Sequence, residues 1–140
     1  MKQRVILDTG PLVAALKKRD RFHAWATSVL GTVQPPLLTC ESVMTEACFL
    51  LRQTYGAQET VMNLVEEGFL QVAFSVQAEA NAIAALIARY QSVPMSLADA
   101  CLVRMAEQLD SSSVMTLDSD FQIYRIHRNQ TIALIIPDEV

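Results

Sequence analysis

The feature that most constrains the fold of this chain is a regular alternation of short apolar segments with helical ones. β-branched and apolar residues predict strands at residues 4–7, 37–39, 69–74, 114–117 and 131–136. Apolar spacing predicts helices at residues 12–16, 22–30, 41–52, 58–67, 75–90 and 96–109. Residues 121–126 are expected to be helical or irregular. This alternation is typical of an α/β fold with a mainly parallel, buried sheet.

Length and composition indicate one domain. The chain has 140 residues and shows no internal repeat or boundary, so we expect a single domain over residues 1–140. Half of the residues are hydrophobic (51%), and the mean hydropathy is +0.25. That is high for a soluble monomer, and it predicts that a partner covers part of the surface.

The sequence favours the cytoplasm. Its longest purely apolar run, residues 82–88, is too short to cross a membrane. The apolar stretch near the N-terminus is too short for a secretory signal. The three cysteines are odd in number and form no C-x-x-C pattern, which is typical of core thiols in a reducing compartment.

Four acidic residues occupy unusual places, because each lies inside or at the end of an apolar segment: Asp8, Glu46, Asp99 and Asp118. A carboxylate near a core lowers stability unless a partner compensates its charge. None of these segments offers its own acid an obvious buried Lys or Arg. Convergence of the four acids on divalent metal ions is one economical explanation.

Each acid also has a structural interpretation. Asp8 is placed to cap the following helix, and Glu46 to reach water from the edge of its helix. Asp99 ends the motif Ser-x-x-Asp, which is close to a capping box. Asp118 and Asp120 both follow the strand predicted at 114–117, and one of them is expected to be a turn residue. Asp118 ranks first because it lies closer to the strand end.

Clustered carboxylates suit Mg²⁺ or Mn²⁺, which are hard cations that prefer oxygen ligands. Such ions can activate a water molecule and clamp a phosphodiester. The Thr9 hydroxyl is a candidate to hydrogen-bond a water at such a site, or to serve as a turn or cap. The formal charge of −4 argues against a DNA-coating protein held by charge alone. It does not exclude nucleic acid, because bound cations reverse the local field.

Four short motifs, in this order, resemble the pattern of the PIN-domain family. They are Val-Ile-Leu-Asp-Thr at residues 5–9, the internal Glu46, Ser-Leu-Ala-Asp-Ala at residues 96–100, and Thr-Leu-Asp-Ser-Asp-Phe at residues 116–121. The resemblance covers essentially the whole chain, and the size is similar to that of VapC-type toxins. It implies a metal-dependent endoribonuclease with a three-layer fold, in which helices flank a central, mainly parallel sheet.

The resemblance also assigns roles to single residues. It implies metal-binding and catalytic roles for Asp8, Glu46, Asp99 and Asp118, and supporting roles for Thr9 and Thr116, with Asp120 as the alternative last ligand. It implies Mg²⁺ or Mn²⁺ as cofactor, RNA as substrate, a homodimer and, for a type II toxin, inhibition by a small antitoxin. PIN domains also serve outside toxin–antitoxin pairs, so both settings stay open.

Two other functions compete with this one. Asp8-Thr9-Gly10 spells the motif of aspartic proteases, but the sheets of those enzymes are mostly antiparallel and this chain is rich in helix. A catalytically idle module that docks a partner helix would leave the acids as caps and rim charges. Basic residues at 17–21 and at 125–128 either contact RNA phosphates or form an ordinary solvated surface.

Overall fold

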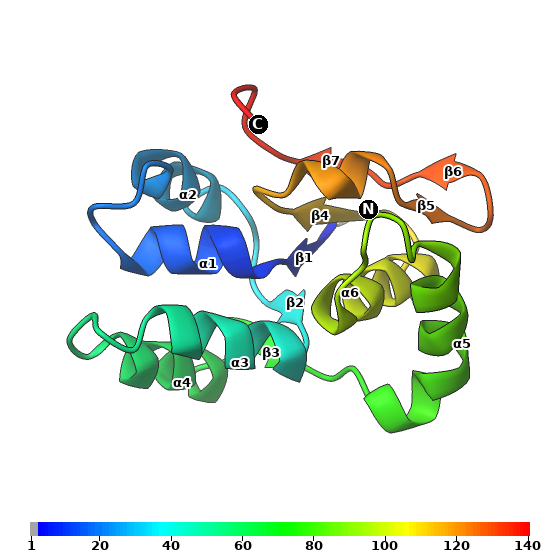
Figure 1. Ribbon diagram of the computed structural model, residues 1–140. Coiled ribbons are helices and arrows are strands. Elements are labelled where there is room, and N and C mark those ends of the chain that lie inside the picture. The colour runs from blue at the N-terminus through cyan, green and yellow to red at the C-terminus, as the bar shows by residue number, and fades with distance from the viewer. Residues whose placement is uncertain (1–2) are drawn as a thin grey trace.

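The computed structural model describes residues 3–140, and a parallel sheet of five strands lies at its centre (Figure 1). The strands are β1 (Arg4–Leu7), β2 (Leu37–Thr39), β3 (Leu70–Val72), β4 (Ser112–Met115) and β7 (Leu134–Ile135). Their order in the sheet is β3-β2-β1-β4-β7, and every neighbouring pair is parallel. The predicted α/β fold is therefore confirmed.

Six α-helices pack around this sheet within residues 3–140: α1 (Thr9–Leu16), α2 (His23–Leu30), α3 (Glu41–Leu50), α4 (Ala57–Glu66), α5 (Val76–Arg89) and α6 (Leu97–Gln108). In Figure 1, α1 to α4 lie on the left, and α5 and α6 lie on the right. Helix α3 contacts both α1 and α6. None of these helices, all within residues 3–140, combines the length and apolar character needed to cross a bilayer.

The strand residues divide between two cores because successive side chains point to opposite faces of a sheet. Val5 and Leu7 of β1 pack into the core under α1, α2 and α4. Ile6, between them, packs into the other core with α5 and α6. In β4, Val114 and Met115 divide in the same way. Helices thus cover the sheet on both faces, as the continuous apolar character of its strands predicts.

The end of the chain differs from the sequence prediction. Residues 121–126 contain the end of a 3₁₀-helix, η1 (Ser119–Gln122), and the strand β5 (Arg125–Ile126). The single strand predicted at 131–136 is wrong, because the segment divides into β6 (Gln130–Thr131) and β7. Strand β6 pairs with β5 in an antiparallel hairpin. The chain then leaves the hairpin to pair with β4, where the Val114 amide donates to the Ala133 carbonyl.

The strand order places a ligand position at the centre of the sheet. From β1 the chain moves to β2 on one side, whereas β4 lies on the other side of β1. In parallel α/β sheets, ligands bind beyond the carboxyl ends of the strands at such a change of direction. Asp8 directly follows β1, and Asp118 follows β4 after two intervening residues. The topology alone therefore brings two predicted site residues to one place.

Candidate active site

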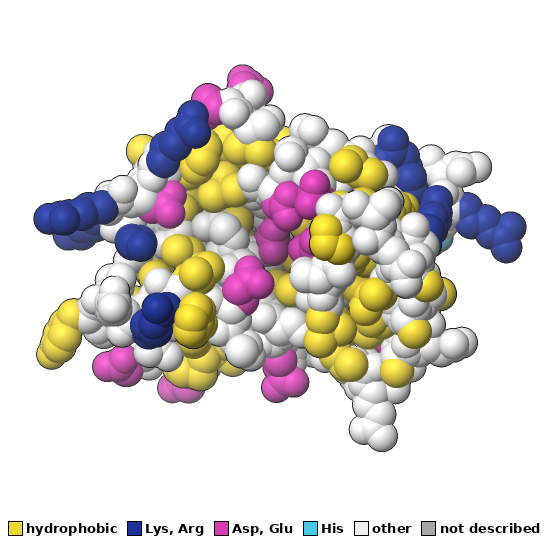
Figure 2. Space-filling view, in the orientation of Figure 1, with side chains coloured by type: hydrophobic (Ala, Val, Ile, Leu, Met, Phe, Trp, Pro, Cys, Tyr) yellow, Lys and Arg dark blue, Asp and Glu magenta, His cyan; other side chains and the backbone are white. Residues whose placement is uncertain are grey.

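A pocket of about 400 Å³ opens at the carboxyl ends of β1 and β4. All four acids singled out from the sequence line it, together with five other residues: Thr9, Gly10, Leu50, Leu117 and Ser119. Figure 2 shows acidic side chains gathered in the middle of the face formed by α1, α3 and α6. The fold therefore brings Asp8, Glu46, Asp99 and Asp118 to one pocket. We call it the carboxylate pocket.

Asp8 is held from both sides of its carboxylate. It is the N-cap of α1 and only 7% exposed. Its Oδ1 accepts a hydrogen bond from the Thr9 amide (2.7 Å), and its Oδ2 accepts one from the Thr116 hydroxyl (2.7 Å). Thr116 is fully buried, and its Oγ1 also accepts a hydrogen bond from the Asp118 amide (2.9 Å). Thr116 thus joins the Asp8 carboxylate to the segment that carries Asp118.

Asp99 enters the pocket from the first turn of α6, where its amide donates to Ser96 Oγ (3.0 Å). The expected helix cap is therefore present, and it fixes the turn that carries the acid. The Tyr124 hydroxyl donates to Asp99 Oδ2 (2.8 Å). Tyr124 is fully buried and lies edge-on against the rings of Tyr90 and Phe121, with centroids 5.0 and 5.2 Å away. These contacts orient the carboxylate.

Asp118 and Asp120 occupy different places. Asp118 lines the pocket and caps η1, where its Oδ1 accepts a hydrogen bond from the Asp120 amide (2.9 Å). Asp120 is half-buried and does not line the pocket. Burial raises the pKa of Asp120, and the charge of Asp118 raises it further. Of the two acids, only Asp118 therefore forms part of the pocket wall.

Glu46 lies at the rim of the pocket, on α3. Val43 and Leu50 lie three positions before and four positions after Glu46, which is the spacing of one helix face. The structure shows Val43 buried but Glu46 and Leu50 exposed, because this side of α3 turns toward the pocket rather than the core. No hydrogen bond or ion pair of Glu46 is found within residues 3–140. Its carboxylate is therefore free to turn inward.

The pocket concentrates negative charge. Burial raises the pKa of Asp8 to about 6; the hydrogen bonds from Thr116 and Thr9 oppose this, and the charges of Asp99 and Asp118 add to it. Burial also raises the pKa of Asp99, and the charge of Asp118 adds to that effect. In the described part of the chain, salt bridges join only Arg104 to Glu79 and Glu107. No basic side chain of residues 3–140 therefore forms an ion pair with the pocket acids.

The donor set fits a hard divalent cation. Every acidic ligand candidate offers oxygen, and the Thr9 hydroxyl is buried with no hydrogen-bond partner among residues 3–140. Within the same residues, no three His, Cys, Asp or Glu side chains stand in the arrangement of a metal site. The four carboxylates line the wall of one pocket.

One residue of this site escaped the sequence reasoning. Tyr124 lies three positions after Phe121, and this spacing is typical of aromatic residues on one side of a helical turn. The spacing is a signal of burial, but it carries no information about where a hydroxyl points. The 2.8 Å contact with Asp99 joins residues 25 positions apart, so only the folded chain reveals it.

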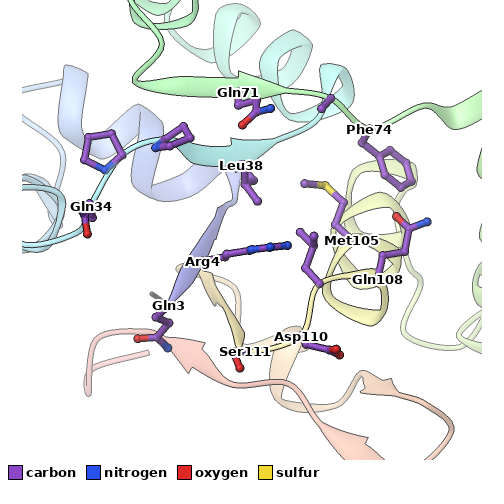
Figure 3. A pocket seen from close by; sticks show the side chains of 14 residues that line it. Gln3, Arg4, Gln34, Leu38, Gln71, Phe74, Met105, Gln108, Asp110 and Ser111 are labelled. Carbon is purple, nitrogen blue, oxygen red and sulfur yellow. The ribbon is translucent and has the colours of Figure 1, made fainter. Parts of the chain in front are cut away.

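A larger cavity of about 800 Å³ lies at the opposite end of β1. Figure 3 shows the Arg4 side chain extended into it from β1 toward Met105 of α6, with glutamines around it. None of the site residues predicted from the sequence lines this cavity. We call it the amino-end cavity.

The sequence profile of the PIN domain family matches residues 5–126. This chain belongs to the PIN domain family. It is 25% identical over 116 residues to Ribonuclease VapC26 of Mycobacterium tuberculosis, an alignment that covers 81% of this chain and 86% of that protein. Its fold is similar to the crystal structure of Mycobacterium tuberculosis VapC20, a sarcin–ricin loop cleaving toxin, with a TM-score of 0.67 and 20% identity over 85% of this chain and 93% of the other.

Proposed function

We propose that this PIN domain protein is a divalent-metal-dependent endoribonuclease that hydrolyses RNA phosphodiester bonds. The observation that carries the proposal is the carboxylate pocket, where four acids from distant parts of the chain meet at the carboxyl ends of β1 and β4. The distant similarity to a protein named a ribonuclease supports it. So does the similarity in fold to a toxin that cleaves the sarcin–ricin loop.

Four acids would hold one or two Mg²⁺ or Mn²⁺ ions: Asp8, Glu46, Asp99 and Asp118. A bound ion of this kind supplies positive charge that stabilises the phosphorane-like transition state and lowers the pKa of a water nucleophile. Burial and two neighbouring acids raise the pKa of Asp8, because they disfavour its charged form. A nearby cation would stabilise that charged form and lower the pKa.

Two buried residues behind the pocket wall orient its acids. The Thr116 hydroxyl holds Asp8 Oδ2, and the Tyr124 hydroxyl holds Asp99 Oδ2. The Thr9 hydroxyl has no partner among the described residues and lines the pocket, where it positions a water or a phosphate oxygen. Glu46 enters from the rim. Because these contacts hold the acidic side chains in place beforehand, the pocket needs to rearrange less during the reaction.

We further propose that the protein is the toxin of a type II toxin–antitoxin pair and forms a homodimer in the cytoplasm. Large apolar side chains are exposed on the elements that carry the pocket acids: Phe49 (60%) on α3, Leu97 (47%) on α6 and Ile123 (52%) directly after η1. Exposed apolar surface of this kind supports a protein partner, either a second copy or a small antitoxin. The three cysteines are unpaired, as a reducing compartment favours.

The test is cleavage of RNA by purified protein with Mg²⁺, with Mn²⁺ and with a chelator. We expect cleavage with either ion, none with the chelator, and none by the Asp8→Asn variant. Circular dichroism of that variant checks that the fold is kept. RNA left intact by the wild-type protein under all conditions would favour the catalytically idle binding module. Equal cleavage by wild type and Asp8→Asn would reveal a contaminating nuclease.

A further inference from the structure

The basic residues of this acidic protein gather at two places. The connection between α1 and α2 carries four exposed basic side chains, which we call the loop cluster: Lys17, Lys18, Arg19 and Arg21. The end of α5 and the β5–β6 hairpin carry three more, the hairpin cluster: Arg89, Arg125 and Arg128. The two clusters hold seven of the eleven Lys and Arg residues of the chain.

Both clusters lie on the face that carries the carboxylate pocket. Figure 2 shows basic side chains at its two ends, over the α1–α2 connection on the left and near β5 and β6 on the right. Acidic side chains fill the middle. On this face, basic side chains lie at both ends and a group of acidic side chains lies between them, while further acids lie along the upper and lower edges.

The loop cluster is close to the pocket and free to bind. Helix α1 begins directly after Asp8 and has eight residues, so it spans about 12 Å before Lys17. No salt bridge of the cluster is present within residues 3–140. The one acid of this connection, Asp20, accepts a hydrogen bond from the Phe22 amide through its Oδ1. Its carboxylate therefore stabilises the turn.

The hairpin cluster is ordered by backbone contacts. Arg89 Nη2 donates to the Arg128 carbonyl (2.6 Å), which joins the end of α5 to the hairpin. Arg125 Nη1 donates to three carbonyls of the preceding turn, among them that of Tyr124. Tyr124 in turn donates to Asp99 in the pocket. The cluster is thus fixed to the segment that orients a pocket acid, and it retains its positive charge.

We propose that one RNA strand lies across this face, with phosphates on the loop cluster at one side of the pocket and on the hairpin cluster at the other. The inference rests on the proposed nuclease function and names the surface that holds its substrate. An extended polyanion can reach two separate positive clusters at once. The acids between the clusters repel phosphate, so binding across the face is favoured when a divalent cation, or the neutralisation of an acid, reduces their negative charge.

The test measures RNA affinity against salt concentration in the Asp8→Asn background, where cleavage is blocked. The probe is a labelled, unstructured oligoribonucleotide of mixed sequence, followed by fluorescence anisotropy. Lys18→Gln with Arg19→Gln removes charge from one cluster, and Arg128→Gln removes it from the other. The matched control is Arg4→Gln, since Arg4 is also exposed and forms no salt bridge within residues 3–140 but lines the amino-end cavity.

Removing one basic side chain that binds a phosphate should flatten the slope of log K against log salt by about 0.7. We expect the three substitutions together to lower the slope by about 2 and the affinity by about tenfold or more at low salt. Arg4→Gln should change neither. The effects of the two clusters should add on a strand long enough to span the face, whereas a dinucleotide should respond to at most one cluster.

Two outcomes separate this inference from the nuclease proposal. If wild type cleaves RNA but the cluster variants bind it with the slope of Arg4→Gln, the surface is wrong and the nuclease stands. The clusters would then suit an acidic protein partner instead. If the slopes fall as expected but wild type cleaves nothing in Mg²⁺ or Mn²⁺, the RNA surface stands and the catalytic proposal fails.

Discussion

The two ends of β1 differ in both size and chemistry. At its amino end, Arg4 extends into a cavity of about 800 Å³ lined by glutamines and apolar side chains. At its carboxyl end, Asp8 lines a pocket of about 400 Å³ with three further acids. The larger cavity is lined by one acid, Asp110, and one base, Arg4. The smaller pocket holds four acids and no base.

We therefore base the proposed active site on the chemistry of the two ends of the sheet rather than on their volume. The aspartates at the carboxyl end are buried or lie close to like charges, and the pKa of Asp8 is raised to about 6. If these acids had no function, replacing one of them with a neutral residue would make the fold more stable. The amino-end cavity shows no comparable crowding of like charges, so its residues serve as controls.

The largest expected effect separates Asp118 from Asp120. Asp118→Asn should lower the rate of RNA cleavage about a thousandfold, since removal of a metal ligand takes away several kcal/mol of transition-state stabilisation. Asp120→Asn should lower it less than about tenfold, because Asp120 does not line the pocket. Single-turnover cleavage with Mg²⁺ measures both rates.

Gln108→Ala, in the amino-end cavity, controls for the general effect of a substitution and should keep the wild-type rate. If Asp118→Asn and Asp120→Asn lowered the cleavage rate equally, Asp120 would also take part in the reaction. A loss for Gln108→Ala as large as that of Asp118→Asn would contradict the division between the two ends of β1.

The next effect concerns the stability of the metal-free protein. The pKa of Asp8 is near its ordinary value of 3.8 in the unfolded chain and about 6 in the folded one. Because the folded state binds this proton more tightly, the resulting stability is complete below about pH 4 and is lost as the pH rises through 6. The loss attributable to Asp8 is about 3 kcal/mol.

Asp8→Asn should therefore be more stable than wild type at neutral pH in a chelator, and the difference should shrink toward pH 4. Urea unfolding at several pH values measures it. Arg4→Gln provides the comparison at the other end of β1 and should show no such trend. If Asp8→Asn were less stable than wild type by the same amount at every pH, the hydrogen bonds of the Asp8 carboxylate would stabilise the fold more than its buried charge destabilises it.

Divalent ions should stabilise the folded protein by mass action. At an ion concentration a hundredfold above the Kd, the free energy of unfolding should rise by about 2.7 kcal/mol. Mn²⁺ or Mg²⁺ titrations followed by thermal unfolding measure this shift. Asp99→Asn should lose most of it, whereas Gln108→Ala should keep all of it. A shift of equal size in both variants would place the ion outside the carboxylate pocket.

Much of this site could be predicted from the sequence, because strands and caps are local signals. Asp8 and Asp118 follow apolar strands, and the Ser96 cap fixes the turn of Asp99, so their placement follows from short motifs. The sequence could not decide whether Glu46 faces the core or reaches water, since α3 has apolar residues on the pocket side as well. The contact between Tyr124 and Asp99 depends on how η1 and β5 pack against α6, which no local pattern specifies.

Tyr124→Phe should give the smallest of these effects. It removes only the hydroxyl that donates to Asp99 Oδ2 (2.8 Å) and keeps the ring that packs against Tyr90 and Phe121. A hydrogen bond to a charged group contributes about 1.5–3 kcal/mol, but a bound ion would hold Asp99 as well. We therefore expect a loss of about 1 kcal/mol in ion affinity, near fivefold in Kd. Isothermal titration with Mn²⁺ measures it. An unchanged Kd together with lower stability would limit Tyr124 to packing.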